Sequence, residues 1–175
     1  DPVSYRARPR AGGATRRVCF YARPATPRRG YELGMEALRL VKERLPEVEI
    51  VFYGTRDPQP RPSFAFVDRG LISAEKLAAL FSNCDVGVVL SLSNPSFVPL
   101  ELMACGCAVV EIASERLEGI ATHGYDALLV EPTAPAIADS VIRLLADDTL
   151  RGRLIANGLA HTRGMDWSNS ARQIE

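Results

Sequence analysis

The sequence predicts an α/β domain with a Rossmann-like parallel sheet that is covered by helices on both faces. Short β-rich runs alternate with helical stretches along the chain, which is the pattern of strands joined by crossover helices. One of these runs, Val86–Leu92 (VGVVLSL), is almost continuously apolar, as parallel strands buried on both faces are. The chain has 175 residues, 47% of them hydrophobic, which suits one domain with a full core.

The bulk charge indicates neither a nucleic acid nor a membrane surface as a partner. The 21 basic and 21 acidic residues cancel, although eight of the arginines fall within residues 1–29. The cysteines show no C-x-x-C spacing and lie in apolar surroundings, so we expect buried free thiols in a reducing cytosol. They are Cys19, Cys84, Cys105 and Cys107.

The first half of the chain is expected to hold three strands and two helices. Proline and glycine make residues 1–16 an expected linker. The strands are expected at Arg17–Tyr21, Glu49–Tyr53 and, more weakly, Ala65–Asp68. One helix is expected from about Tyr31 to Leu45, with an apolar face of Leu33, Ala37, Leu40 and Val41, and another from an N-cap at Ser73 to about Phe81.

The second half continues the alternation without an internal repeat. After the strand at Val86–Leu92, a helix is expected from about Pro99 to Ala104, with Gly106 as its stop. Further strands are expected at Ala108–Ile112 and Ala127–Val130. Two closing helices contain Ile137, Val141, Leu144 and Leu145, and then Leu150–Leu159.

Ligands of such folds bind beyond the carboxyl ends of the strands, which selects the loops after Tyr21, Ser91 and Ile112. The loop after Tyr21 contains Arg23, Arg28 and Arg29 and ends at Gly30. Guanidinium groups grip phosphate oxygens in pairs and keep their charge at any working pH, so this loop suits a diphosphate. The composition alone is equally compatible with a solvated basic loop.

The loop after Ser91 runs into a helix whose first N–H groups, at Val98–Leu100, could bind an anion. Glu101 follows on the first turn of this helix. Its carboxylate has two interpretations: it stabilises the helix end, or it accepts hydrogen bonds from two vicinal ribose hydroxyls.

These segments carry a family resemblance. Leu100–Val110 (LELMACGCAVV) resembles the "LEAMACGxPVV" segment of the retaining "group 1" glycosyltransferases of GT-B fold. Four further segments match the family in order: Arg23–Gly30, Gly70–Ile72 with Leu77, Leu80, Phe81 and Asp85, Gly124–Pro132, and Trp167–Ser168. The resemblance extends from about Arg17 to Glu175, and the loops are most similar to rhamnosyltransferase-type enzymes of bacterial surface-polysaccharide assembly.

The resemblance implies that residues 17–175 are the nucleotide-sugar-binding domain and residues 1–16 a linker from an N-terminal acceptor domain. It implies transfer of a sugar, with retention, from a nucleoside diphosphate to a glycan or lipid-linked acceptor, so this domain alone would bind donor without catalysis. We expect no metal or other cofactor, because the sequence has no D-x-D-type carboxylate pair. A cytoplasmic enzyme is implied, with peripheral association at the inner face of the membrane for the full-length protein.

The implied site residues are drawn from three loops. Arg23, Arg29 and Glu101 would act in catalysis, with the arginines stabilising the departing diphosphate. The donor-binding set is Arg23, Arg28, Arg29, Gly70, Leu71, Ser93, Asn94, Phe97, Val98, Pro99, Leu100 and Glu101.

Two departures from the family concern the donor. The family commonly has a second glutamate eight positions before the one matched by Glu101, and this sequence has Ser93 there. A serine leaves room for a less polar sugar such as a 6-deoxyhexose. The arginine loop is also one residue longer than usual, so Arg28 or Arg29 replaces the family lysine, and we favour Arg29.

Two other functions stay open from the sequence. One is a sugar-nucleotide epimerase of the same architecture, although this chain is poor in the acids and histidines that such enzymes use. The other is a non-catalytic module that binds nucleotide or phosphate. The absence of G-x-G-x-x-G and G-x-x-x-x-G-K after any expected strand disfavours dinucleotide dehydrogenases and P-loop NTPases.

Overall fold

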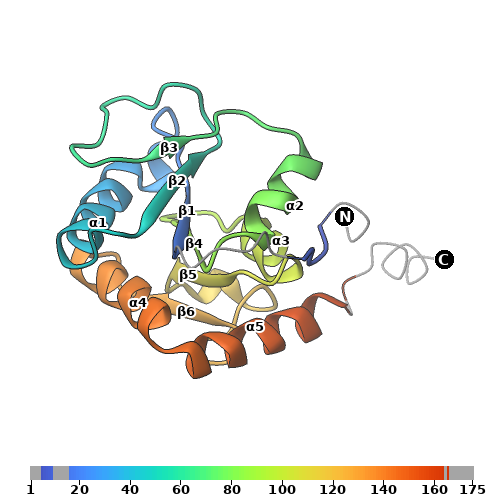
Figure 1. The fold of residues 1–175 in the computed structure, drawn as a ribbon. Coiled ribbons are helices and arrows are strands. Elements are labelled where there is room, and N and C mark those ends of the chain that lie inside the picture. The colour runs from blue at the N-terminus through green and yellow to red at the C-terminus, as the bar shows by residue number, and fades with distance from the viewer. Residues whose placement is uncertain (1–4, 10–15, 164, 166–175) are drawn as a thin grey trace.

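The computed structural model, which describes residues 5–9, 16–163 and 165, confirms the predicted α/β fold. Within these residues six strands form one sheet in the order β3-β2-β1-β4-β5-β6, and every neighbouring pair is parallel (Figure 1). The strands are β1 Arg17–Tyr21, β2 Glu49–Tyr53, β3 Val67–Asp68, β4 Val86–Val89, β5 Ala108–Ile112 and β6 Ala127–Val130.

Helices cover both faces of the sheet (Figure 1). The α-helices are α1 Tyr31–Arg44, α2 Ala74–Ser82, α3 Val98–Ala104, α4 Ala134–Ala146 and α5 Asp148–Arg163. Two short 3-10 helices, η1 Pro27–Arg29 and η2 Glu115–Leu117, follow β1 and β5. Helices α1 and α4 lie together over one core cluster, α2 and α3 cover the other, and α5 contacts both α3 and α4. This layered core follows from strands that are buried on both faces.

Two strands are shorter than predicted. The strand predicted at Ala65–Asp68 is limited to β3, Val67–Asp68. The strand predicted at Val86–Leu92 ends at Val89. Beyond it, the backbone N–H of Ser91 donates to the side chain of Glu111 at 2.8 Å, so this N–H does not continue the strand ladder.

The buried face of α1 is rotated relative to the predicted face. Ala37 and Val41 are buried as predicted, but Leu33 and Leu40 are only partly buried, and Gly34 is buried in addition. A Cβ atom on Gly34 would lie 2.2 Å from the ring of Phe20. The missing side chain therefore lets α1 pack closely on β1, which a pattern of apolar residues cannot indicate.

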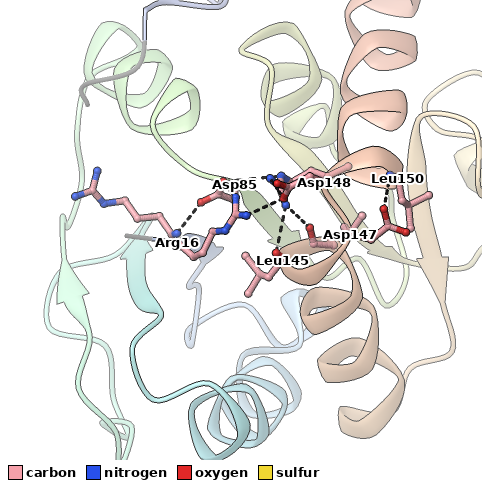
Figure 2. Close-up of polar contacts among 9 residues, drawn as sticks. Arg16, Asp85, Leu145, Asp147, Asp148 and Leu150 are labelled. Atoms are coloured by element: carbon pink, nitrogen blue, oxygen red, sulfur yellow. Dashed lines mark hydrogen bonds and ion pairs between the residues drawn. The ribbon is translucent and has the colours of Figure 1, made fainter. Parts of the chain in front are cut away.

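The amino ends of the central strands are joined to α5 by a polar network (Figure 2). Asp85, whose side chain is 4% exposed, accepts hydrogen bonds from the backbone N–H of Arg17 at 2.9 Å and the guanidinium of Arg16 at 3.4 Å. Arg151 of α5 bonds Asp148 at 2.6 Å and lies 3.9 Å from Asp85. Because buried charges need such partners, Asp85, one of the residues in the family resemblance, has a structural role here.

Several other predictions concern single features. All four cysteines are buried thiols outside any disulfide, as predicted. Helix α2 begins after Ser73, whose hydroxyl accepts a hydrogen bond from the backbone N–H of Lys76 at 3.4 Å.

Residues 5–9 of the predicted linker form no helix or strand, and the matched segment Trp167–Ser168 lies outside the described residues. Among the described helices, none has the length and apolar character needed to cross a membrane.

Candidate functional site

The strand order reverses at the centre of the sheet, where β1 has β2 on one side and β4 on the other. Ligands of open α/β sheets bind at such a switch point, outside the carboxyl ends of the strands. The loops after β1 and β4 meet there. The backbone N–H of Leu92 donates to the carbonyl of Arg28 at 2.9 Å, and the Arg29 guanidinium donates to the Ser91 hydroxyl at 2.8 Å.

Two arginines flank the ring of Tyr21, the last residue of β1. The guanidinium carbons of Arg23 and Arg29 lie 5.8 and 5.9 Å from the ring centroid, and Arg23 also donates to the Tyr21 hydroxyl at 3.2 Å. Within the part of the chain that the structure describes, neither arginine forms an ion pair with a carboxylate. The aromatic ring orients both cations, and their charge stays available to an anion.

The turn that positions Arg29 depends on glycine. The 3-10 helix η1 ends at Gly30, which has a φ of +55° and leads directly into α1. A left-handed conformation of this kind is accessible to glycine at little cost. The sequence prediction that Gly30 joins the arginine loop to a helix is thus confirmed.

A cavity of about 290 Å³ opens beside these arginines. It contains five of the residues predicted for the donor site, from the loops after β1 and β3 and from α3. It is lined by Tyr21, Arg23, Tyr53, Gly54, Gly70, Leu71, Ile72, Leu77, Val98 and Glu101. The backbone N–H of Gly54 donates to the carbonyl of Gly70 at 3.0 Å, which joins the loops after β2 and β3 at the cavity wall.

Among the described residues, Glu101 is the one carboxylate that lines this cavity. Burial raises the pKa of Glu101, while a hydrogen bond from the Tyr5 hydroxyl acts in the opposite direction. The ring of Tyr5 stacks on Phe81 with centroids 6.2 Å apart. The side chain of Glu101 is thus held by Tyr5. Both interpretations of Glu101, ribose binding and stabilisation of the helix end, stay predictions.

The other predicted residues, Arg29 among them, do not line the cavity. Arg28 is exposed, Pro99 is buried, and Leu100 packs against the core under α3. Phe97 is 61% exposed. The first turn of α3 contributes only Val98 and Glu101 to the lining.

Ser93 and Asn94, which were also predicted to bind the donor, are exposed in the loop after β4. Arg116 fixes this loop, because its guanidinium donates to the carbonyl of Ser93 at 2.8 Å and lies 3.5 Å from the Asn94 side-chain oxygen. Their place in a donor site stays a prediction.

The sequence interpretation missed an aromatic pair on the cavity floor. Tyr21 and Tyr53 end the neighbouring strands β1 and β2 in register, and their rings stack with centroids 5.4 Å apart. The Tyr53 hydroxyl is buried and has no hydrogen-bond partner among the described residues, and burial raises the Tyr53 pKa well above its ordinary value. A tyrosine at the last position of both strands was the available signal.

A buried acid was missed as well. Glu111 lies in β5, is fully buried and accepts hydrogen bonds from Ser91, which in turn contacts Arg29. The signal was a glutamate within the apolar run Ala108–Ile112 (AVVEI). For metals, a search of the described residues finds no cluster of three or more histidine, cysteine or acidic side chains that could hold an ion.

Comparison with known proteins gives three kinds of similarity. The family described as "WsaF, C-terminal domain" matches residues 16–142. The O-antigen biosynthesis protein RfbC of Myxococcus xanthus is 36% identical over 162 residues, which are 90% of this chain and 13% of that protein. The phosphatidyl-myo-inositol mannosyltransferase of Mycobacterium tuberculosis is 31% identical over 170 residues, 90% of this chain and 45% of that enzyme.

Solved glycosyltransferase structures share the fold. The HepE protein of Anabaena, solved in complex with UDP-glucose, superimposes with a TM-score of 0.77 at 18% identity, over 92% of this chain and 48% of that one. The chain therefore spans less than half of each of these relatives and of this neighbour.

Proposed function

The chain belongs to the family of the WsaF C-terminal domain, among the group 1 glycosyltransferases, and on that premise we propose that it holds the nucleoside diphosphate sugar donor of such an enzyme. The observation that carries the proposal is the pair Arg23 and Arg29. Both guanidinium groups flank Tyr21 at the switch point without a carboxylate partner among the described residues. Two cations held at one point without a direct ion pair among the described residues match the two charges of a diphosphate.

The nucleoside occupies the cavity in this proposal. Glu101, at the cavity wall, accepts hydrogen bonds from the ribose hydroxyls, and Gly70 and Leu71 border the base. The cavity volume of about 290 Å³ is at the lower end of the range for small-molecule sites, which suits a nucleoside with its diphosphate outside the cavity. The UDP-glucose complex of the similarly folded HepE protein supports this class of donor.

The chemistry required of this chain is stabilisation of the leaving group. When the bond between the sugar and the diphosphate breaks, negative charge develops on the departing phosphate oxygen. Fixed positive charge from Arg23 and Arg29 lowers the energy of that state without a metal. We propose transfer with retention, to a glycan or lipid-linked acceptor held by an N-terminal domain, with residues 1–16 as the linker and residues 17–175 as the donor domain.

The setting of the reaction is part of the same proposal. The names of the relatives, an O-antigen biosynthesis protein and a mannosyltransferase acting on phosphatidyl-myo-inositol, support bacterial surface-glycan assembly. We place the full-length enzyme in the cytoplasm, with peripheral association at the inner face of the membrane.

Calorimetry with this chain tests the proposal. UDP, GDP and dTDP are compared with their nucleosides, and at least one diphosphate should bind far more tightly than its nucleoside. Loss of a charge-assisted hydrogen bond costs on the order of 1.5–3 kcal/mol, so Arg23→Ala should lower the affinity for that diphosphate by roughly tenfold or more. Arg153→Ala, which removes an exposed arginine of α5, is the matched control and should leave affinity unchanged. Equal affinities of all diphosphates and nucleosides would contradict the proposal.

A further inference from the structure

A buried carboxylate lies beneath the arginine loop. Glu111 of β5 has no exposed surface. Its carboxylate accepts hydrogen bonds from the backbone N–H groups of Ser91 and Ile112, both at 2.8 Å, and from the Ser91 hydroxyl at 3.1 Å. It forms no ion pair within the described part of the chain. An unpaired buried charge is costly, so a neighbouring charge is needed to account for it.

The Ser91 hydroxyl connects this carboxylate to the candidate site. The Arg29 guanidinium donates to the Ser91 oxygen at 2.8 Å, and the same hydroxyl donates onward to Glu111. Ser91 is itself buried, with 5% of its surface exposed. One hydroxyl therefore separates the buried acid from an arginine that, in the function proposed above, binds the donor diphosphate.

We propose that Glu111 is a positioning residue of the donor site: it holds the Arg29 guanidinium through Ser91, and it takes up a proton from solvent when the donor diphosphate becomes the counter-charge of Arg29. This inference rests on the proposed function of Arg29. In the donor-free protein the negative charge of Glu111 balances Arg29. In the complex the phosphate oxygens take that place, and the buried carboxylate becomes neutral.

The electrostatics support such an exchange. Burial raises the pKa of Glu111 to about 7, while its hydrogen bonds and Arg29 act in the opposite direction. The carboxyl group thus titrates near neutral pH. A diphosphate brought close to it adds like charge, which raises the pKa further. By linkage, donor binding must then be accompanied by proton uptake in the range above about pH 7.

Other charged groups do not offer Glu111 an alternative partner. Its register neighbours, Val89 in β4 and Leu129 in β6, are apolar, and Arg29 is the charged group that acts on it most strongly. On the helices that contact β5, Arg143, Arg153 and Arg163 are exposed, and the other titratable side chains are held by partners elsewhere. These pairs are Glu101 with Tyr5, Asp139 with Arg44, Arg151 with Asp148, and His161 with Asp126.

A purely structural role for Glu111 would predict something different. The hydrogen bond from the Ser91 N–H joins the segment after β4 to β5, and this function needs no change of protonation on donor binding. Counting protons during binding separates the two roles, because a structural carboxylate leaves the proton count unchanged.

The experiment is calorimetry in two buffers of different ionisation enthalpy at about pH 7.5, with the tightest binder among UDP-glucose, GDP-mannose and dTDP-rhamnose. The diphosphate of a nucleotide sugar keeps its charge near neutral pH, so protons taken up are taken up by the protein. We expect roughly half a proton per donor, and an affinity that falls about threefold to tenfold from about pH 6 to about pH 8. The uncharged nucleoside should bind without proton uptake.

Glu111→Gln supplies the decisive comparison, because glutamine keeps the shape of the side chain and cannot titrate. This variant should bind donor with no proton uptake and with an affinity that is flat across the same pH range. Glu115→Gln, an identical change at an exposed position of η2, should behave as the parent.

Two results would overturn the role of Glu111: donor binding by the parent without proton uptake, or equal proton uptake by Glu111→Gln. If Glu111→Gln does not fold, the test is the number of protons that the parent takes up on binding the nucleotide sugar compared with the number taken up on binding the nucleoside. Equal numbers would contradict the inference. Failure of all three donors to bind would instead overturn the proposed function itself.

Discussion

Arg28 and Arg29 are adjacent in η1 and make a matched pair for testing the diphosphate site. The sequence left either one in the place of the family lysine. The structure distinguishes them, because the Arg29 guanidinium bonds the Ser91 hydroxyl at 2.8 Å and lies 5.9 Å from the centre of the Tyr21 ring. The Arg28 side chain is exposed. We therefore predict that Arg29→Ala weakens donor binding far more than Arg28→Ala.

The expected magnitudes follow from these environments. A charge-assisted hydrogen bond from Arg29 to a phosphate oxygen is worth about 1.5–3 kcal/mol, so its removal should weaken binding roughly tenfold to a hundredfold. Arg28 acts only as an exposed charge that salt screens. Its removal should cost less than about 1 kcal/mol, which is no more than about fivefold.

Calorimetry with a nucleoside diphosphate and its nucleoside measures both changes. Arg29→Ala should lose affinity for the diphosphate and keep its affinity for the nucleoside, since the cavity that receives the nucleoside is lined by other residues. Circular dichroism and melting curves of both variants check that the fold is intact. Equal losses in the two variants, or a larger loss in Arg28→Ala, would refute the assignment of Arg29.

Three substitutions and one comparison of donors test other residues. Glu101→Gln should weaken nucleotide binding about tenfold in calorimetry and barely move the melting temperature; lower stability with intact affinity would favour helix capping. The pKa of Glu111 is raised to about 7 in the folded chain, above that of a glutamate in the unfolded chain. The contribution of protonated Glu111 to the free energy of unfolding is therefore present at acid pH and is lost as the pH rises through about 7. In chemical denaturation, the free energy of unfolding of Glu111→Gln should rise by roughly 2 kcal/mol relative to that of the parent between about pH 5 and about pH 8. A difference between the two proteins that does not change with pH would contradict this. Asp85→Asn should lower the free energy of unfolding by about 1.5–3 kcal/mol and leave donor affinity unchanged, so that reduced affinity at full stability would refute a structural role. The full-length enzyme has Ser93 in the place of a glutamate, and we expect it to prefer dTDP-rhamnose to UDP-glucose. In turnover assays the two kcat/KM values should differ by the equivalent of about 1–3 kcal/mol. The reverse preference would exclude the interpretation that Ser93 makes room for a deoxysugar.

The order and type of the elements could be predicted because each is bounded by local signals. Pro46, Ser73 and Gly106 mark a helix end, a helix start and a helix stop, and the apolar runs between them are strands. The rotation of α1 could not be predicted, because it depends on the contact between Gly34 and Phe20. The end of β4 could not be predicted either, because it depends on Glu111 of the neighbouring strand, whose side chain accepts a hydrogen bond from the backbone N–H of Ser91.

The same distinction holds for the site. Arg23, Arg29 and Glu101 could be proposed from sequence because loop position and residue type are both local properties. Tyr53 and Glu111 could not be proposed in this way, because the role of each depends on contacts with residues that the sheet brings close. A charged residue within an apolar strand is the general signal for such groups, since a buried charge requires a partner.

A structure of this chain with a bound nucleoside diphosphate sugar tests the central claim most directly. We predict phosphate oxygens within about 2.7–3.2 Å of the guanidinium groups of both Arg23 and Arg29, with the ribose hydroxyls on the Glu101 carboxylate. A donor bound elsewhere, or one whose diphosphate contacts neither arginine, would contradict it.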